Sequence, residues 1–237
     1  MLSDKIIFSF HNVSERFNLG FNNLKIKKFN TILSHIHSLK IKNSEVCFDD
    51  GYEDIFINLN NVELGIEKTI FPITNYIDKF NTWDVNFLIN RKKHINVQQL
   101  RKMHVNNWKI GSHGHNHICY SNLSYDKIYE DLKKSKDILE NLLNKEINLF
   151  TPPFGYFDSS FLPIIKKAGY KDIYLNMCYI DEEIVDSELN ISVRVPIYSI
   201  DNKYSINRKL NHSKFQTKFD ELVHFFSKAT VAVKKIY

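Results

Sequence analysis

The chain has 237 residues, of which 43% are hydrophobic and 25% are charged. This length is sufficient for one sizeable core, and the sequence excludes a repeat or low-complexity protein. The net charge of +5 comes from scattered lysines without a block of like charge, which favours a solvated surface over nucleic-acid binding. No linker rich in Pro, Gly or Ser divides the chain, so we expect residues 1–237 to form a single domain.

The expected elements alternate between short β-prone runs and helical patterns. In chain order the expected strands are 5–10, 45–48, 68–73, 108–112, 147–151, 172–175 and 191–195, and the expected helices are 27–39, 52–64, 97–107, 124–143, 159–169 and 218–229. Strands that alternate with helices pair in parallel through crossover connections. The sequence therefore predicts an α/β protein with about seven parallel strands.

The most regular of these helices is 124–143. Its residues Ile128, Leu132 and Leu139 lie on one face, and Ser124 stands where an N-cap residue belongs.

The N-terminal segment MLSDKIIFSFHNVS has an apolar run shorter than a signal peptide needs, and no later run reaches transmembrane length. Cys47, Cys119 and Cys178 leave one cysteine unpaired in any disulfide scheme, which fits reduced thiols. We therefore expect a cytoplasmic protein. Cys119 follows a histidine cluster and is a conceivable ligand, although a small buried side chain is favoured.

Polar residues with catalytic capacity gather directly after the expected strands. His11 follows the first strand, Asp49 and Asp50 the second, and the HGHNH segment 113–117 the fourth. The carboxyl ends of parallel strands form one edge of a sheet or barrel, where active sites are built from loops. The expected active site lies at this edge.

His113 and His117 are four residues apart, a spacing that lets both rings face one point. With one carboxylate from Asp49 or Asp50 they form an open hydrolytic metal site, for which zinc is the expected ion. Ordinary polar loop histidines are the alternative. Neighbouring strand side chains diverge, so the two aspartates are expected to differ, one as ligand and one as proton acceptor. Capping of the next helix remains an alternative for one of them.

The order of motifs resembles the polysaccharide deacetylase family of carbohydrate esterases. The matching segments are VCFDDGYEDIF (46–56), TIFPI (69–73), WKIGSHGHNHICYSNLS (108–124), LFTPPFG (149–155) and IIKKAGY (164–170). The resemblance implies a distorted (β/α) barrel in which Asp49 is the catalytic base. It also implies that Asp50, His113 and His117 bind the metal.

The sequence departs from the family pattern at two places. Thr151 stands where many members have an arginine, and no catalytic histidine follows the late strand 191–195. The IIFSFHNV segment is similar to the N-terminal strand of the circularly permuted poly-N-acetylglucosamine deacetylases, which makes His11 the candidate acid. A histidine that only forms a hydrogen bond at the barrel mouth is the alternative. Arg194 is a weak candidate to orient Asp49, and a surface or structural salt bridge is favoured for it.

The remaining histidines are expected to be solvated or half-buried: His35, His37, His94, His104 and His224. His115 lies between the two expected ligands, where a loop side chain usually points to water. The segment Pro153, Phe154, Gly155 and Tyr156 can form the wall of a sugar or acetyl pocket, with core packing as the alternative.

The resulting hypothesis is a metal-dependent hydrolase that removes an N-acetyl group from an amino sugar in a glycan or glycan precursor. Three alternatives stay open: an O-acetyl esterase or small-sugar N-deacylase, a non-catalytic carbohydrate-binding relative, and a two-histidine, one-carboxylate oxygenase. The expected partner is the N-acetylated sugar, and the sequence leaves the oligomeric state open.

Overall fold

The structure is a computed structural model that describes residues 5–18, 20–83, 91–177, 186 and 188–211. Its strands are β1 Lys5–Phe10, β2 Asn12–Val13, β3 Asn23–Leu24, β4 Asn43–Phe48, β5 Glu67–Ile70, β6 Lys109–Ile110, β7 Leu149–Phe150, β8 Asp172–Asn176 and β9 Asn190–Pro196. Its α-helices are α1 Ile26–Ser38, α2 Glu53–Leu59, α3 Val97–Val105, α4 Tyr125–Leu143, α5 Leu162–Lys167 and α6 Lys203–Leu210. The expected helix 218–229 lies outside the described residues.

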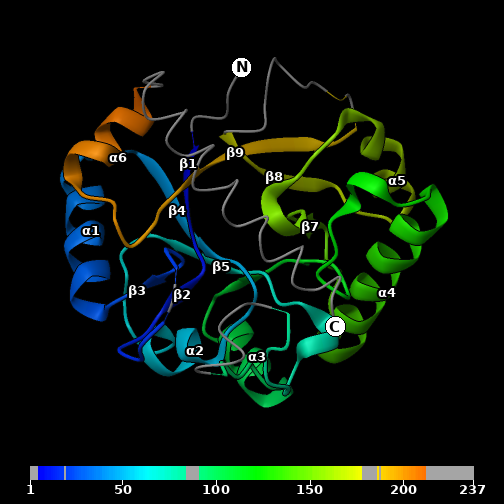
Figure 1. The fold of residues 1–237 in the computed structure, drawn as a ribbon, viewed down its shortest axis with the longest axis horizontal. Helices are drawn as coiled ribbons and strands as arrows, with labels where there is room; N and C mark the ends of the chain where they lie inside the picture. Colours follow the sequence, from blue (N-terminus) through cyan, green and yellow to red (C-terminus); the bar gives the residue numbers. More distant parts are fainter. Residues whose placement is uncertain (1–4, 19, 84–90, 178–185, 187, 212–237) are drawn as a thin grey trace.

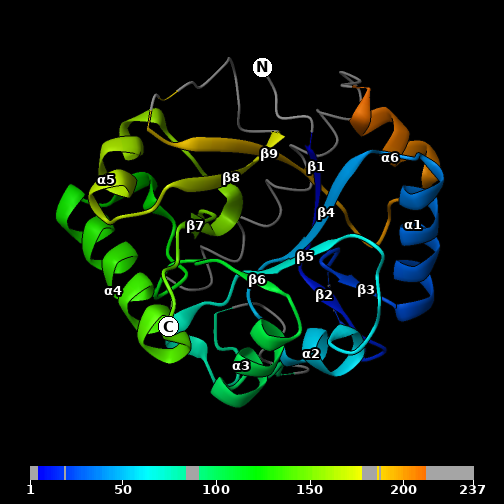
Figure 2. The same ribbon diagram turned by 180° about the vertical axis from the view of Figure 1, so that it is seen from behind.

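Seven of these strands form one parallel sheet in the order β6-β5-β4-β1-β9-β8-β7. The two ends of this order approach each other, because Ser112 after β6 forms a parallel bridge with Phe150 of β7. The Ser112 N–H donates to Leu149 O at 2.9 Å, and the Thr151 N–H donates to Ser112 O at 3.0 Å. The sheet is thus a nearly closed, distorted (β/α) barrel, and the predicted fold class is confirmed (Figure 2).

Alternate residues of each strand face opposite sides of the barrel wall. Ile7, Cys47 and Tyr174 belong to a small apolar cluster inside the barrel. Phe8 and Phe48 belong instead to the main core between the barrel and its helices. Because strands of this kind are buried on both faces, they read as continuous apolar runs in the sequence.

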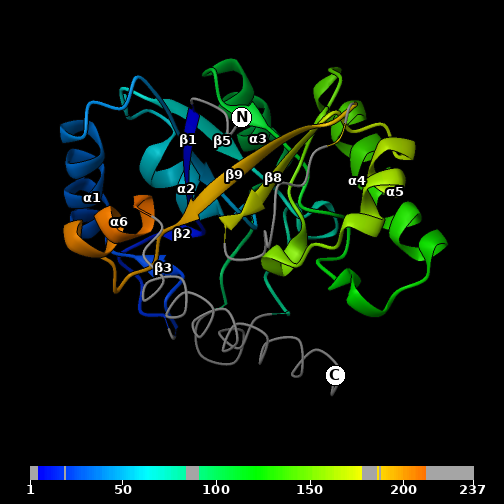
Figure 3. The ribbon, with the colours of Figure 1, turned by 90° about the horizontal axis from the view of Figure 1, so that it is seen from above.

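The helices surround the sheet, with α1 and α6 on one side and α4 and α5 on the other (Figure 1). Seen from above, α1 and α6 again lie side by side (Figure 3), and His35 Nε2 lies 2.9 Å from Asn207 Oδ1 between them. Of the described helices, none is both long and apolar enough to cross a membrane.

Several boundaries differ from the sequence prediction, most of all at three elements. The helix expected over 52–64 ends at Leu59, where an Asn60–Asn61 pair of weak helix formers follows. The strands expected over 108–112 and 147–151 shrink to two residues each, because they form the two edges at which the barrel closes.

Helices α4 and α6 differ in how well the sequence predicted them. Ser124 stands at the N-cap position of α4 as expected, but its side chain makes no capping hydrogen bond. Helix α6 was not predicted, because its buried face carries a serine, an isoleucine and a lysine and shows little apolar periodicity.

Candidate active site

The turn after β4 places the two aspartates in different directions. Asp49 follows Cys47 at the inward-facing spacing, so its carboxylate points to the barrel axis. Asp50 and Gly51 both have positive φ angles, +68° and +70°, which turn the chain sharply. A Cβ on Gly51 would lie 2.7 Å from Pro72 Cα, so only glycine fits here. Neither aspartate caps α2, whose N-cap residue is Tyr52 and has no side-chain capping hydrogen bond.

The histidine loop after β6 is held by Asp131 of α4. Its two carboxylate oxygens accept hydrogen bonds from the backbone N–H groups of His115 and Asn116, both at 2.9 Å. Gly114 leaves room for this carboxylate, since a Cβ there would lie 2.8 Å from Asp131 Oδ2. The sequence prediction did not include Asp131, although an acidic residue on the apolar face of the expected helix was a signal of such a role.

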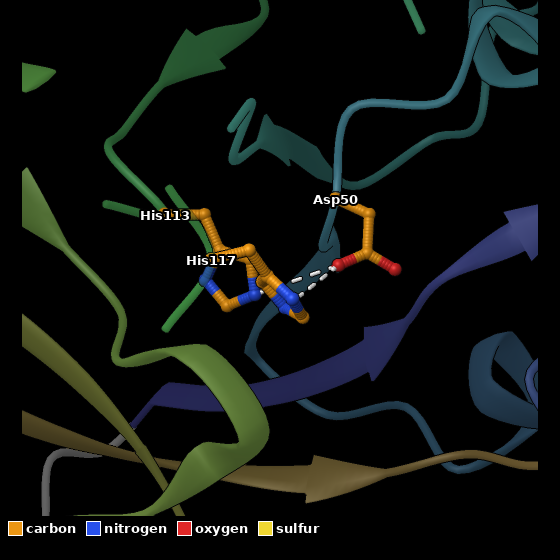
Figure 4. A group of neighbouring side chains, drawn as sticks. All are labelled: Asp50, His113 and His117. Carbon is orange, nitrogen blue, oxygen red and sulfur yellow. Dashed lines mark ion pairs between the residues drawn. The ribbon is translucent and has the colours of Figure 1, made fainter. Parts of the chain in front are cut away.

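His113 and His117 converge on the carboxylate of Asp50. Asp50 Oδ1 lies 3.6 Å from His113 Nε2 and 3.4 Å from His117 Nε2 (Figure 4). All three side chains are buried, and one ligand atom of each lies within 4.8 Å of the others. The structure therefore brings together the three side chains that the sequence analysis assigned to one metal site.

The protonation of His113 suits metal binding. Its Nδ1 lies 2.9 Å from Thr151 O, which accepts only if Nδ1 carries the proton, so the lone pair of Nε2 faces Asp50. Burial lowers the pKa of His113 and keeps the ring neutral, although the charge of Asp49 opposes this shift. Two imidazoles and a carboxylate at these separations fit a divalent ion with open positions, as zinc accepts in hydrolytic sites.

Arg194 of β9 binds Asp49, the other aspartate of the turn. Its Nη1 donates to Asp49 Oδ1 at 2.7 Å, and the arginine side chain is fully buried. Burial would raise the pKa of Asp49, but the Arg194 guanidinium, with His113 and His11, outweighs burial and lowers it. The expected surface position of Arg194 was wrong, and its salt bridge is made with Asp49, the contact that the weaker candidate role requires. An arginine two residues before the end of a buried strand was the available signal.

His11 lies beside this pair at the end of β1. Its Nδ1 is buried and has no hydrogen-bond partner in the part of the chain that the structure describes. Burial lowers the pKa of His11 to about 4, although the charge of Asp49 acts in the opposite direction. The ring is therefore neutral at pH 7 in the free protein.

Two aromatic rings lie against His117, the last histidine of the loop. The ring of His117 lies 3.9 Å from Trp83 and 4.4 Å from Phe154, measured between ring centroids. Phe154 has a positive φ of 59° between the buried Pro153 and Gly155, and this turns its ring toward the site. Of the predicted pocket wall, Phe154 thus borders the site. Tyr156 packs 6.1 Å from Phe161, toward the core, which was the stated alternative.

His94 contacts the backbone of the turn that holds Asp49 and Asp50. The prediction that His94 is solvated or half-buried was wrong. The side chain is buried, and its Nδ1 lies 2.9 Å from Asp50 O. The ring packs against Tyr52 at 4.8 Å and Tyr76 at 5.2 Å. Burial lowers the pKa of His94 to about 3, so a neutral ring donates from Nδ1 to the Asp50 carbonyl.

Two further expectations are corrected, and others are confirmed. His115 is buried, with Nδ1 2.9 Å from Thr74 Oγ1, and does not point to water. Cys119 is partly exposed and does not belong to the metal-ligating group among the described residues. His35 and His104 are half-buried and His37 is exposed, as expected. Cys178 and His224 lie outside the described residues.

A family profile for polysaccharide deacetylases matches residues 38–173. A peptidoglycan-N-acetylglucosamine deacetylase of Bacillus cereus is 33% identical over 128 residues, which are 54% of this chain and 54% of that protein. A poly-beta-1,6-N-acetyl-D-glucosamine N-deacetylase of Staphylococcus aureus is 28% identical over 135 residues, which are 53% and 45% of the two chains. The chain thus spans about half the length of these curated relatives.

The fold also resembles solved structures. A de-N-acetylase from Aggregatibacter actinomycetemcomitans superposes with a TM-score of 0.68 at 13% identity, covering 86% of this chain and 99% of that one. This likeness concerns the fold alone. The profile match covers more than half of the sequence and includes both aspartates and both convergent histidines. The chain therefore belongs to the polysaccharide deacetylase family.

Proposed function

We propose that this chain is a metal-dependent hydrolase that removes an N-acetyl group from an amino sugar in a glycan or glycan precursor. The observation that carries the proposal is that two neighbouring aspartates in the turn after β4 have different partners. Asp50 faces two imidazoles, while Asp49 next to it is bound by Arg194. Family membership supports deacetylation of a glycan as the general reaction.

The proposed ligands are Asp50 Oδ1, His113 Nε2 and His117 Nε2, and zinc is the proposed ion. When bound, a divalent cation would polarise the acetyl carbonyl and lower the pKa of a coordinated water. The activities for which the two curated relatives are named support an N-acetylated amino sugar as substrate. We also propose that residues 1–237 act as one catalytic domain.

Asp49 is the proposed general base. Because its pKa is held below the ordinary value, the carboxylate is ionised at neutral pH and can accept a proton from the attacking water. Arg194 Nη1 occupies one carboxylate oxygen and fixes the orientation of the group, which leaves the other oxygen to receive the proton.

His11 is the proposed acid that protonates the departing amine. Its pKa of about 4 in the free protein has to rise when substrate is bound. The negative charge that develops on the acetyl oxygen during attack acts in this direction. If His11 has this role, His11→Ala should slow amide hydrolysis by roughly 10²-fold, and hydrolysis of an aryl acetate, whose leaving group needs less protonation, much less.

The decisive experiment combines metal analysis with acetate release. The purified protein would be assayed with zinc on a short N-acetylglucosamine oligomer, on monomeric N-acetylglucosamine and on an O-acetylated sugar. Metal-dependent acetate release from the N-acetylated oligomer is expected. Release only from the ester would point to an O-acetyl esterase, and release only from the monomer to a small-sugar deacylase. Sugar binding without turnover would leave a carbohydrate-binding relative.

A further inference from the structure

Asn176, the last residue of β8, faces the interior of the barrel mouth. Tyr174, two residues earlier on the same strand, packs inside the barrel 5.7 Å from Phe71. Since side chains two residues apart on a strand share a face, Asn176 points to the same interior. It is also paired in register with Arg194 of β9, whose side chain reaches Asp49.

The segment after β7 lies on the other side of Asn176. Thr151 Oγ1 donates to Tyr174 O at 2.9 Å, which draws the start of this segment against the carboxyl end of β8. Phe154, three residues further on, borders His117. Asn176 therefore stands in the wall of the mouth between the segment that contacts a proposed metal ligand and the arginine that binds the proposed base.

The side chain of Asn176 is buried, and its carboxamide oxygen is unpaired among the described residues. The residue is 5% exposed, and its Oδ1 has no hydrogen-bond partner within the described part of the chain. Arg194 Nε and Nη2 and His11 Nδ1 are equally without partners among these residues. Buried polar atoms in folded proteins are almost always paired. Three such side chains at one end of the barrel indicate that a bound molecule completes their hydrogen bonds.

The order of the strands indicates that Asn176 contacts a part of the substrate other than the reacting amide. The proposed metal ligands and the acid come from the ends of β4, β6 and β1, and β9 lies between β1 and β8. The acetamide must lie among those first groups to react. A carboxamide carries one acceptor and two donors without charge, a set that matches a sugar hydroxyl, which both donates and accepts.

We propose that Asn176 is a substrate-binding residue that forms a hydrogen bond with a ring hydroxyl of the N-acetylated sugar, an inference that rests on the proposed function. In this role Asn176 recognises the sugar ring and does not contact the acyl group. The energy of this contact is available to a sugar substrate and absent for an acetyl ester that has no sugar ring.

Asn176→Leu tests this contact, because leucine has a similar size and no hydrogen-bonding atoms. We expect kcat/KM for a short N-acetylglucosamine oligomer to fall about tenfold, the usual size of one lost hydrogen bond. The kcat/KM for a nitrophenyl acetate should change less than about twofold. Asn176→Ser provides a second variant in case leucine impairs folding, and zinc content should equal that of the wild type in both.

Asn148 provides a matched control. Its Oδ1 is also buried without a partner among the described residues, but Asn148 precedes β7 at the opposite end of the barrel. Asn148→Leu should leave both rates unchanged. Equal losses on both substrates in Asn176→Leu, or no loss on either, would overturn the inference and assign Asn176 to structural packing or to a bound water.

A binding measurement separates this inference from the proposed function. The zinc-loaded wild type and both leucine variants would be titrated with the oligomer by calorimetry. Weaker binding in Asn176→Leu alone supports the contact even if the wild type releases no acetate, an outcome that would sink only the proposed reaction. A wild type that does not bind the oligomer would overturn the inference itself.

Discussion

The two ends of the barrel both bury a carboxylate, and they treat it in opposite ways. At the amino end, Glu45 of β4 is fully buried, and both of its oxygens have protein partners. Its Oε1 accepts from Thr69 Oγ1, and its Oε2 accepts from Tyr174 at 3.0 Å and from Lys109 at 3.4 Å, with Lys5 closer still. At the carboxyl end, Asp50 faces the imidazoles of His113 and His117, and several polar atoms around Asp49 lack partners among the described residues.

The carboxylate that stabilises the fold and the carboxylates proposed for function thus lie at opposite ends of β4. A buried carboxylate without compensation is costly, so Glu45 recruits cations and hydroxyl donors from neighbouring strands. Among the described residues, the mouth retains unpaired polar atoms on Asn176 and Arg194. It also has positive φ angles at Asp50, His117 and Phe154. Such costs are tolerated where a ligand or substrate completes the site.

The largest effects on zinc binding and turnover are expected from substitutions of the proposed metal ligands. Asp50→Ala and His113→Ala each remove one of three donors, so zinc affinity should fall by more than the roughly 10–100-fold typical of an outer-shell loss. Turnover should fall with it. Zinc content of the dialysed proteins, measured by plasma emission spectrometry, checks this result. Stoichiometric zinc in both variants would mean that the ion binds elsewhere.

The second test removes the proposed base and keeps the metal. Asp49→Asn preserves shape but cannot accept a proton, so turnover should fall by roughly 10²-fold or more. Zinc content should stay at the wild-type level, since Asp50 and the two histidines are unchanged. Loss of zinc in Asp49→Asn would show that the roles of the two aspartates are exchanged.

The third test addresses the arginine that orients Asp49. Burial raises the pKa of Asp49 and the Arg194 guanidinium is the main group that opposes it, so Arg194→Met should raise this pKa from its wild-type value. Because the base works only when ionised, the acidic limb of the pH–rate profile should move to higher pH. At its optimum the variant should lose up to roughly 10²-fold in kcat from misorientation. A profile that keeps the wild-type acidic limb would argue against Asp49 as the titrating base.

The barrel and the metal-ligating group could be predicted from the sequence because each rests on local patterns. Strand and helix runs alternate, and the DDG and HxxxH motifs stand at strand ends. The pattern did not show Asp131, His94 and Arg194, whose roles depend on contacts between distant segments. Arg194 lies 145 positions from Asp49 in the sequence, and only the pairing of β1 with both β4 and β9 brings the two side chains together.

Local reasoning also failed where the backbone departs from its usual conformation. Alternation in a regular strand would send Asp50 away from the histidines, and the positive φ angles of Asp50 and Gly51 reverse that direction. The sequence prediction of divergent aspartates was right in outcome, but the direction of each depended on this turn. His94 appeared to be an ordinary polar residue because its partner is a backbone carbonyl, which leaves no trace in the sequence.

The smallest expected effect on turnover comes from the amino end, and it completes the comparison. Glu45→Gln replaces one acceptor with a donor and leaves Lys5 without the carboxylate that helps to raise its pKa. The free energy of unfolding in urea should fall by about 1–3 kcal/mol, the range for an unsatisfied buried polar group. The kcat/KM of the folded fraction should stay within about twofold of the wild type, because no group at the mouth changes.

Glu67→Gln is the matched control for this prediction. Glu67 binds the same two lysines, but 53% of its side chain is exposed. Burial opposes its ionisation, yet its hydrogen bonds with Lys109 and Lys5 lower the pKa of Glu67 to about 2. Solvent screens these contacts, so the stability loss should be under about 1 kcal/mol. If Glu45→Gln instead lowered turnover without loss of stability, the amino end would be coupled to the site, and the separation of stability from function along β4 would fail.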